Sequence, residues 1–226
     1  KEYLILLFEL KKSFPDYYRY YGRRIAKRLS PSINDIFIKN FKNFSLDEEI
    51  LKNLNSDQYQ SLTLNSKFKK NIIEIGFGDG KHLFGLAQAN KDTHFIGCEV
   101  FINGLGKALK KIVENNLTNI SLCGLNCLYL LENIKDSSID KIFIINPDPW
   151  EKKRHFKRRL INKEFIALMY KKIKNGGKVI VTTDSSSYFL SILEIIKNEE
   201  IDFEETVQKM LDKGDELYNI SKYQKK

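Results

Sequence analysis

An aspartate held between two prolines is the residue of this chain best placed to do chemistry. Asp148 stands in the Asn-Pro-Asp-Pro-Trp segment of residues 146–150, directly after an apolar run. Pro147 has a fixed φ and Pro149 biases Asp148 toward an extended backbone, so the carboxylate is presented rigidly. Trp150 beside it offers a flat face for a base or for the protein core. The segment therefore predicts a fixed negative charge next to an aromatic surface.

A dense basic run continues from this segment. Residues 151–160 hold three lysines and three arginines against one glutamate. Lysines provide point charges and arginines provide planar forks, and both bind phosphate groups. A solvated charged surface is the usual explanation of such a run, but its position directly after Asp148 favours phosphate binding. The predicted contacts come from Lys152, Arg154, Lys157, Arg158 and Arg159.

A glycine-rich segment, Glu-Ile-Gly-Phe-Gly-Asp-Gly, occupies residues 74–80 between an apolar run and a helical pattern. Gly76, Gly78 and Gly80 allow a tight turn and close approach of a ligand, and the helix start offers free N–H groups. The spacing is one residue tighter than the dinucleotide pattern, and the lysine–serine pair of a triphosphate-binding loop is missing. The segment indicates either a cofactor cradle or a plain tight turn.

Two polar residues follow the next two apolar runs. Glu99 comes about twenty residues after the glycines, where a carboxylate is able to accept hydrogen bonds from both hydroxyls of a ribose. Asn126 lies where its side chain is able to read an adenine edge or, equally well, to cap a helix. Taken with the glycine segment, these residues predict an adenosine-ribose site.

The elements that must position these residues alternate along the chain. The pattern predicts strands at 71–75, 93–99, 119–125, 139–145 and 178–183, and helices near 81–89, 103–115, 163–174 and 187–198. Such alternation is typical of an α/β fold with a parallel sheet covered on both faces. Asn175-Gly176-Gly177 is predicted to end a helix. Residues 203–210 and 218–223 alternate weakly, which predicts an antiparallel C-terminal strand pair.

The first 70 residues have a different character. They contain Ser-Pro and Asn-rich breaks and a helical stretch near 46–62, so residues 1–70 are predicted to be an extension docked on the core formed by residues 71–226. Most of the net charge of +9 lies in residues 17–28 and 151–164. The first window mixes tyrosines with Arg23, Arg24 and other basic residues, a composition that suits RNA phosphates and unstacked bases.

Composition and patterning exclude several classes of protein. No apolar run approaches the roughly 20 residues that span a bilayer, and no signal-peptide pattern is visible, so neither a membrane nor secretion is expected. Cys98, Cys123 and Cys127 are predicted to be reduced and mostly buried. The three histidines are scattered, and no metal site is predicted.

The basic motif and the glycine segment together closely resemble those of the bacterial-type tRNA (guanine-N7)-methyltransferases. The matching runs are Asn-Pro-Asp-Pro-Trp-x-Lys-x-Arg-His-x-Lys-Arg-Arg and, upstream, Glu-Ile-Gly-Phe-Gly-x-Gly. The resemblance extends from Gly22 to the C-terminus. It implies a class I (Rossmann-like) S-adenosylmethionine-dependent methyltransferase fold with a mostly parallel, doubly wound sheet. It also implies a cytoplasmic enzyme, monomer or homodimer, that methylates N7 of a guanosine in the tRNA variable loop (position 46).

The resemblance assigns roles to single residues. Glu74, Glu99 and Asn126 are implied to bind S-adenosylmethionine, and Asp148 is implied to serve both cofactor binding and catalysis. Because guanine N7 carries no proton, we expect Asp148 to position the guanine and offset its growing positive charge rather than to act as a base. The implied tRNA contacts are Lys152, Asp184, Ser221, Lys222, Tyr223 and Gln224, with Arg23 and Arg24 in a matching N-terminal segment.

Three residues depart from the family pattern, and three other functions share parts of this sequence. Asn126 and Gln224 replace the usual aspartate and glutamate, and Asn146 replaces a phenylalanine. The Asn-Pro-Asp-Pro-Trp segment also resembles the Asn-Pro-Pro-aromatic motif of amino-methylating enzymes. A nicotinamide-dependent oxidoreductase would share the glycines and Glu99, and a catalytically silent RNA-binding protein would share the charge. None of these three functions explains both the aspartate held between prolines and the basic run that follows it.

Overall fold

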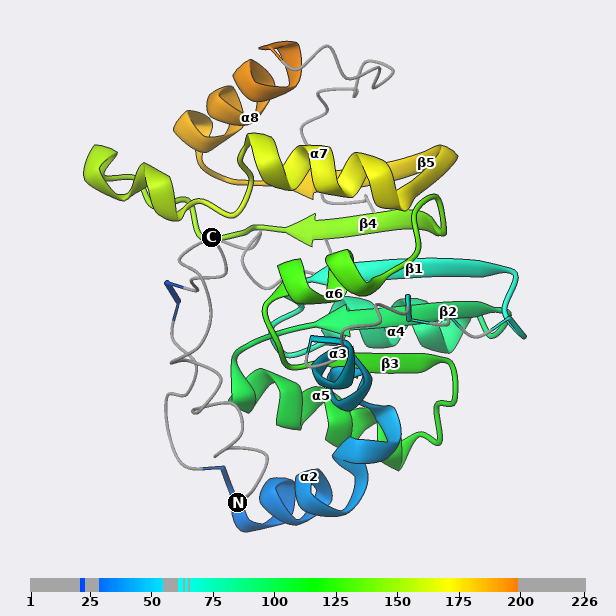
Figure 1. Cartoon of the computed structure of the whole chain (residues 1–226). Coiled ribbons are helices and arrows are strands. Elements are labelled where there is room, and N and C mark those ends of the chain that lie inside the picture. The colour runs from blue at the N-terminus through cyan, green and yellow to red at the C-terminus, as the bar shows by residue number, and fades with distance from the viewer. Residues whose placement is uncertain (1–20, 23–28, 55–60, 63, 65, 199–226) are drawn as a thin grey trace.

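The computed structural model describes residues 21–22, 29–54, 61–62, 64 and 66–198, and its centre is one five-stranded sheet (Figure 1). All neighbouring strands are parallel, in the order β3-β2-β1-β4-β5. The sequential order reverses between β1 and β4, so the sheet is doubly wound. The strands are β1 (Lys70–Ile75), β2 (Thr93–Cys98), β3 (Ile120–Cys123), β4 (Ile139–Ile145) and β5 (Ile173–Thr182).

Helices cover both faces of the sheet (Figure 1). α4 (Lys81–Ala89) and α5 (Ile102–Glu114) pack on one face, and α6 (Cys127–Asn133) and α7 (Lys163–Lys172) pack on the other. α8 (Ser186–Asn198) follows β5 and contacts α7. Because both faces are covered, all six residues of β2 are buried. No helix in the described ranges has the length and apolarity needed to cross a membrane.

The sheet divides the core into two apolar clusters. Phe95 of β2 faces α4 and α5 and packs in one cluster with Leu105, whereas its neighbour Ile96 packs in the other with Leu130 and Phe165. Successive side chains of a strand point to opposite faces, so adjacent residues supply the two clusters. The parallel sheet with helices on both faces confirms the predicted α/β fold. The predicted strand pair at 203–210 and 218–223 lies outside the described residues.

One helix precedes the sheet where the sequence pattern predicts a break. α2 (Pro31–Phe44) begins at the Ser30–Pro31 pair, and the Ser30 hydroxyl accepts a hydrogen bond from the Ile33 N–H. Serine is a favoured cap and proline is tolerated in the first helical turn, so the pair starts a helix. The predicted break is therefore the start of a helix over residues 31–44, which the sequence pattern did not predict. α2 packs against α5.

A second N-terminal helix is fixed to the sheet by a buried carboxylate. α3 (Asp47–Leu54) lies within the helical stretch predicted at 46–62, of which residues 55–60 are not described. Both carboxylate oxygens of Asp47 accept hydrogen bonds from the Gly124 N–H, at 2.9 and 3.1 Å. The Leu46 N–H donates to the Leu122 carbonyl of β3 at 2.8 Å. The assignment of residues 1–70 to an extension stays a prediction.

The last strand begins earlier than predicted. Ile173 already pairs with Ile139, and the register then shifts, so that Lys178 pairs with Lys141. Gly176 within this interval has a φ of 74°, which allows the extra residues to form a bulge. The Asn-Gly-Gly segment therefore does not end a helix directly. α7 ends at Lys172, two residues before the predicted end.

The three cysteines are free and buried, as predicted. Burial raises the pKa of Cys127 to about 12, and it also raises the pKa of Cys123 well above its ordinary value. Because the thiolate is the reactive form, we expect no labelling of the folded protein by a thiol-specific disulfide reagent within minutes. Three equivalents should react in denaturant, and labelling of one thiol before unfolding would contradict this.

In the described ranges, no cluster of side chains is suited to holding a metal ion.

His94 is buried at the amino end of β2. Its side chain is 5% exposed, stacks on the Phe68 ring at 5.3 Å and lies 2.9 Å from the Ser121 hydroxyl through Nε2. Burial lowers the pKa of His94 to about 4. The folded state therefore favours the neutral ring, while the unfolded chain protonates near the ordinary value.

We expect His94 to make the protein less stable in acid. Above the ordinary histidine pKa of about 6.5, His94 is neutral in both states and the free energy of unfolding keeps its full value. As the pH falls toward 4, the unfolded chain binds a proton that the folded protein does not, and the free energy of unfolding drops. The full loss is on the order of 3 kcal/mol, from the linkage of pKa to unfolding free energy. Urea unfolding at pH 7.5 and 4.5 measures it, with His94→Gln as the comparison. The stability drop should be smaller in the variant, and equal drops would contradict the expectation.

Candidate active site at the carboxyl edge of the sheet

The parallel topology brings the predicted site residues to one edge of the sheet, where all five strands end (left in Figure 1). The loops after β1 and β4 leave the sheet on either side of the point where the strand order reverses. Ligands of open α/β sheets bind in the crevice at such a point. The glycine segment and the segment carrying Asp148 follow two neighbouring strands and therefore both lie where a ligand is expected to bind.

The loop after β1 forms an open cradle. Gly76, Gly78 and Gly80 have φ values of 72°, 60° and 72°, a backbone region that favours glycine. A Cβ added at Gly76 or Gly78 would meet nothing within 4 Å, whereas one at Gly80 would lie 2.9 Å from the Ala108 Cβ of α5. The loop thus packs against α5 through Gly80 and through the Gly78 carbonyl, which lies against Gly104, while the Cβ directions of Gly76 and Gly78 stay open to an approaching ligand.

Glu99 is bound into this loop rather than exposed at the end of its strand. Its Oε2 accepts a hydrogen bond from the Gly78 N–H and its Oε1 accepts one from the Phe101 N–H, both at 2.8 Å. Burial raises the pKa of Glu99, the backbone N–H groups lower it, and the negative charge of Asp148 raises it further. Each oxygen keeps a further lone pair, so the carboxylate remains able to accept from a ribose diol.

Glu74 occupies a different environment from Glu99. Its Oε2 lies 2.9 Å from Nδ1 of His82 on α4, and both side chains are buried. The His82 ring meets the edge of Phe143 at 4.8 Å, and burial raises the pKa of Glu74. The structure thus gives this carboxylate an internal partner that joins β1 to α4. The predicted contact between Glu74 and the cofactor stays a prediction.

Asn126 caps α6, one of the two roles that its position in the sequence allows. Its Oδ1 accepts a hydrogen bond from the Leu128 N–H at 3.0 Å. The side chain lies at the carboxyl end of β3, beside the end of β2 that carries Glu99. A contact with an adenine edge therefore stays a prediction.

The segment that carries Asp148 has an unusual backbone. Asn146 and Trp150, at its two ends, have φ values of 48° and 45°, and positive φ is uncommon for a residue as bulky as tryptophan. Asn146 is tied to the end of β5, since its N–H donates to the Thr182 carbonyl at 3.0 Å. Asp148 itself is exposed, and its charge acts on the buried Glu99. Strain of this kind persists where surrounding contacts hold it, and it clusters at functional sites.

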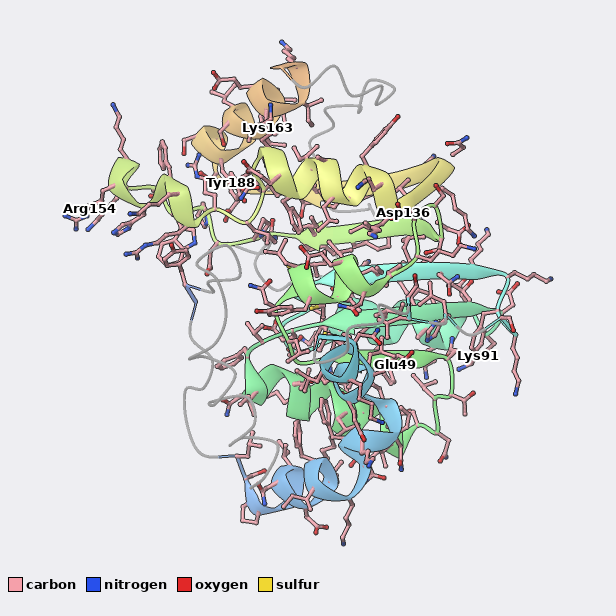
Figure 2. The ribbon with its side chains drawn as sticks, viewed as in Figure 1. Glu49, Lys91, Asp136, Arg154, Lys163 and Tyr188 are labelled. Carbon is pink, nitrogen blue, oxygen red and sulfur yellow. The ribbon has the colours of Figure 1, made fainter. Side chains whose placement is uncertain are left out.

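The basic run divides into an exposed part and an enclosed part. It forms the 3₁₀ helix η3 (Lys153–Arg158), and Figure 2 shows Arg154 projecting from its outer end. Partial burial, together with the charges of Arg158, Arg154 and Lys152, lowers the pKa of His155. The lowered pKa of His155 reflects the concentration of positive charge around its ring. The exposed cations are Lys152, Lys153, Arg154 and Lys157.

The enclosed part consists of the last two arginines. The Arg158 guanidinium lies over the Trp150 ring at 5.0 Å and over the Tyr21 ring at 5.3 Å, which places Tyr21 beside this part of the basic run. Arg159 is buried and contacts α8. Its predicted role as a phosphate contact does not fit this burial, because its donors already have protein partners.

The remaining predicted substrate residues are placed only in part. Asp184 is exposed two residues after the end of β5, on the same edge of the sheet as Asp148. Arg23, Arg24, Ser221, Lys222, Tyr223 and Gln224 lie outside the described residues. The sequence reasoning missed Ser187 and Ser191 of α8, which contact Arg159. Their spacing of four residues, which places them on one helix face, is a signal that was available.

The doubly wound sheet, the open glycine cradle and the bound acid after β2 define a protein of the class I methyltransferase type. A family model described as a putative methyltransferase matches residues 69–226. A tRNA (guanine-N(7)-)-methyltransferase of Wolbachia pipientis is 35% identical over 170 residues, which cover 75% of this chain and 72% of the relative. The chain belongs to the tRNA (guanine-N7)-methyltransferase family.

Other relatives differ in length. A tRNA (guanine-N(7)-)-methyltransferase of Chromobacterium violaceum is 42% identical over 136 residues, which cover 60% of each chain. A bifunctional methyltransferase of Rickettsia prowazekii is 36% identical over 179 residues, which cover 79% of this chain and 32% of that protein. The chain thus spans about a third of the bifunctional relatives that it matches.

Proposed function

We propose that this chain transfers a methyl group from S-adenosylmethionine to N7 of a guanosine in the variable loop of tRNA, at position 46. One observation carries the proposal: Asp148 is presented on a constrained loop after the strand next to the one that ends in the glycine cradle, with an exposed basic helix directly after it. Family membership supports the same reaction.

The crevice fits S-adenosylmethionine, the cofactor of this family. Gly76 and Gly78 leave open space above the backbone, which suits a close-lying methionine portion. Glu99 would accept the ribose hydroxyls, and Asn126 would lie near the adenine. When bound, the cofactor supplies an activated methyl group on a positively charged sulfur. The negative charges of Glu99 and Asp148 favour a cation in this crevice.

The reaction needs little acid–base chemistry from the protein. Guanine N7 has a lone pair and no proton, so it attacks the methyl carbon directly while the carbon–sulfur bond breaks. The electron pair of that bond stays on sulfur, and the positive charge passes to the purine. The protein therefore contributes mainly by aligning N7 with the methyl group, an effect of several kcal/mol.

Asp148 fits the charge that appears on the guanine. Its side chain is exposed, and the segment's flanking prolines and positive-φ residues limit its movement. A preorganised negative charge stabilises a developing cation without having to reorient during the reaction. We infer that Asp148 positions the guanine and stabilises its positive charge, and that it also faces the cofactor.

The exposed basic helix supplies the contacts to tRNA. Lys152 directly precedes η3, and Arg154 and Lys157 lie on it; all three are exposed and would neutralise phosphates near the target guanosine. Asp184, at the end of the neighbouring strand, lies on the same edge and would contact the nucleotide. The Arg158 guanidinium lies over the Tyr21 and Trp150 rings, and these aromatic side chains would pack against an unpaired base.

Methylation of a tRNA transcript, with the product nucleoside identified after complete digestion, tests this function. We expect 7-methylguanosine as the product. A methyl group on an exocyclic amine would indicate an amino-methylating enzyme instead. Calorimetry adds a second discrimination: S-adenosylmethionine should bind and NAD should not, whereas binding of NAD alone would favour an oxidoreductase.

A further inference from the structure

Arg159 differs from every other described cation of the basic motif in being buried, with 6% of its surface exposed. Its Nε donates to the Pro149 carbonyl at 2.8 Å. Its Nη1 donates to the Ser191 hydroxyl at 2.9 Å and to the Ser187 carbonyl at 3.5 Å, and its Nη2 donates to the Ser187 hydroxyl at 3.1 Å. All three guanidinium nitrogens thus have protein acceptors.

Two aromatic rings also lie against the same guanidinium. Its central carbon lies 3.8 Å from the centre of the Phe156 ring and 4.7 Å from that of Tyr188. Tyr188 is fully buried, and its hydroxyl accepts a hydrogen bond from the Ile161 N–H at 3.0 Å. Figure 2 shows Tyr188 on the inner side of this region and Arg154 at its outer end. The enclosure leaves Arg159 no open face for a phosphate group.

The shortest Arg159 hydrogen bond, to the Pro149 carbonyl, shows which segment Arg159 holds in place. Pro149 is the residue between Asp148 and Trp150, and it has no N–H with which to anchor itself. The segment is joined to β5 at its first residue, Asn146, and to α8 through Arg159 at its fourth. Two anchors from two different elements thus bracket Asp148.

We propose that Arg159 is a positioning residue, which fixes the Asp148 carboxylate by tying the Pro149 carbonyl to Ser187 and Ser191 of α8, and that it does not bind tRNA. The inference deepens the proposed function and rests on it. α8 thereby supports the loop that carries Asp148, through the contacts of Ser187 and Ser191 with Arg159.

The test compares Arg159→Lys and Arg159→Ala with the wild type. Lysine keeps the charge but cannot form the three-way fork, so both variants should lose turnover at saturating tRNA, by roughly 10- to 100-fold. The salt dependence of tRNA binding should stay unchanged. Lys153→Ala is the matched contrast, since Lys153 is an exposed cation of the same motif. It should flatten the salt dependence of tRNA binding, a change that the Arg159 variants should not show.

A second measurement reports on the loop without requiring activity. Trp150 is the only tryptophan of the chain, so its fluorescence observes this segment alone. We expect acrylamide to quench Trp150 more strongly in both Arg159 variants and to the wild-type extent in Lys153→Ala. If the Arg159 variants fail to fold, the double variant Ser187→Ala and Ser191→Ala removes both hydroxyl acceptors, keeps the bonds to the Pro149 and Ser187 carbonyls, and should show the same changes to a smaller degree.

The outcomes separate this inference from the proposed function. Wild-type turnover and quenching in Arg159→Lys would overturn the positioning role, as would a flattened salt dependence with normal saturated turnover. If the wild-type protein methylates no tRNA, the proposed function fails. Quenching that then rises in the Arg159 variants and not in Lys153→Ala would still support the anchoring of the loop, while unchanged quenching would overturn it.

Discussion

Replacing Asp148 with asparagine is expected to lower turnover about 100-fold or more at saturating tRNA and cofactor. Asparagine keeps the size and the hydrogen-bonding oxygen of the side chain but removes the charge that would stabilise the cationic guanine. Loss of one preorganised electrostatic contact typically costs two to three orders of magnitude in turnover. Single-turnover methyl transfer from radiolabelled S-adenosylmethionine measures the chemical step directly.

Glu151→Gln provides the control for this experiment. Glu151 is an exposed carboxylate three residues after Asp148, so its substitution removes the same charge from nearly the same place. We expect its turnover to stay within about threefold of wild type, because long-range charge effects at an exposed site are weak. A folded Asp148→Asn protein with turnover as high as that of Glu151→Gln would contradict the catalytic role of the carboxylate.

Removing the exposed cations of the basic motif is expected to have the largest effect on tRNA binding. Each phosphate contact contributes roughly 0.7 to 0.9 to the slope of log affinity against log salt concentration. Replacing Lys152, Lys153, Arg154 and Lys157 by alanine should therefore reduce the slope by about three and weaken binding roughly 100- to 1,000-fold near 0.1 M salt. Binding of S-adenosylmethionine should not change. Filter binding over a salt series measures both quantities.

The opposite edge of the sheet offers a matched control. Lys67, Lys69, Lys70 and Lys91 are exposed near the amino ends of β1 and β2, far from the loops that carry the site. Replacing these four lysines removes the same charge, yet we expect the salt slope to change by less than one unit. Equal changes in the two quadruple variants would mean that tRNA senses the overall charge and not this helix.

Local patterns in the sequence were sufficient to predict the sheet and its loops. Buried parallel strands are continuous apolar runs, and glycines or prolines mark where each run ends. The glycine cradle, Glu99 and the Asp148 segment were therefore predicted together at one edge, which the structure confirms. The short α6 was not predicted, since its seven residues hold less than two full turns of pattern.

Long-range partners account for what the sequence could not show. Arg159 looks the same as its exposed neighbours in the sequence, and only the fold brings Ser187 and Ser191 to it, from 28 and 32 residues away. Glu74 likewise finds His82 because α4 folds back over β1. Such tertiary contacts decide whether a charged side chain binds substrate or supports the protein, and a charge run alone does not encode that choice.

The most direct measurement compares two tRNA transcripts that differ at one atom. One carries guanosine at position 46 of the variable loop, and the other carries 7-deazaguanosine there, in which a C–H group replaces N7 and its lone pair. Competition binding confirms that the protein binds both equally. We predict methyl transfer from labelled S-adenosylmethionine to the first transcript and none to the second. Equal labelling of both transcripts, or labelling of neither, would contradict methylation at N7 of this guanosine.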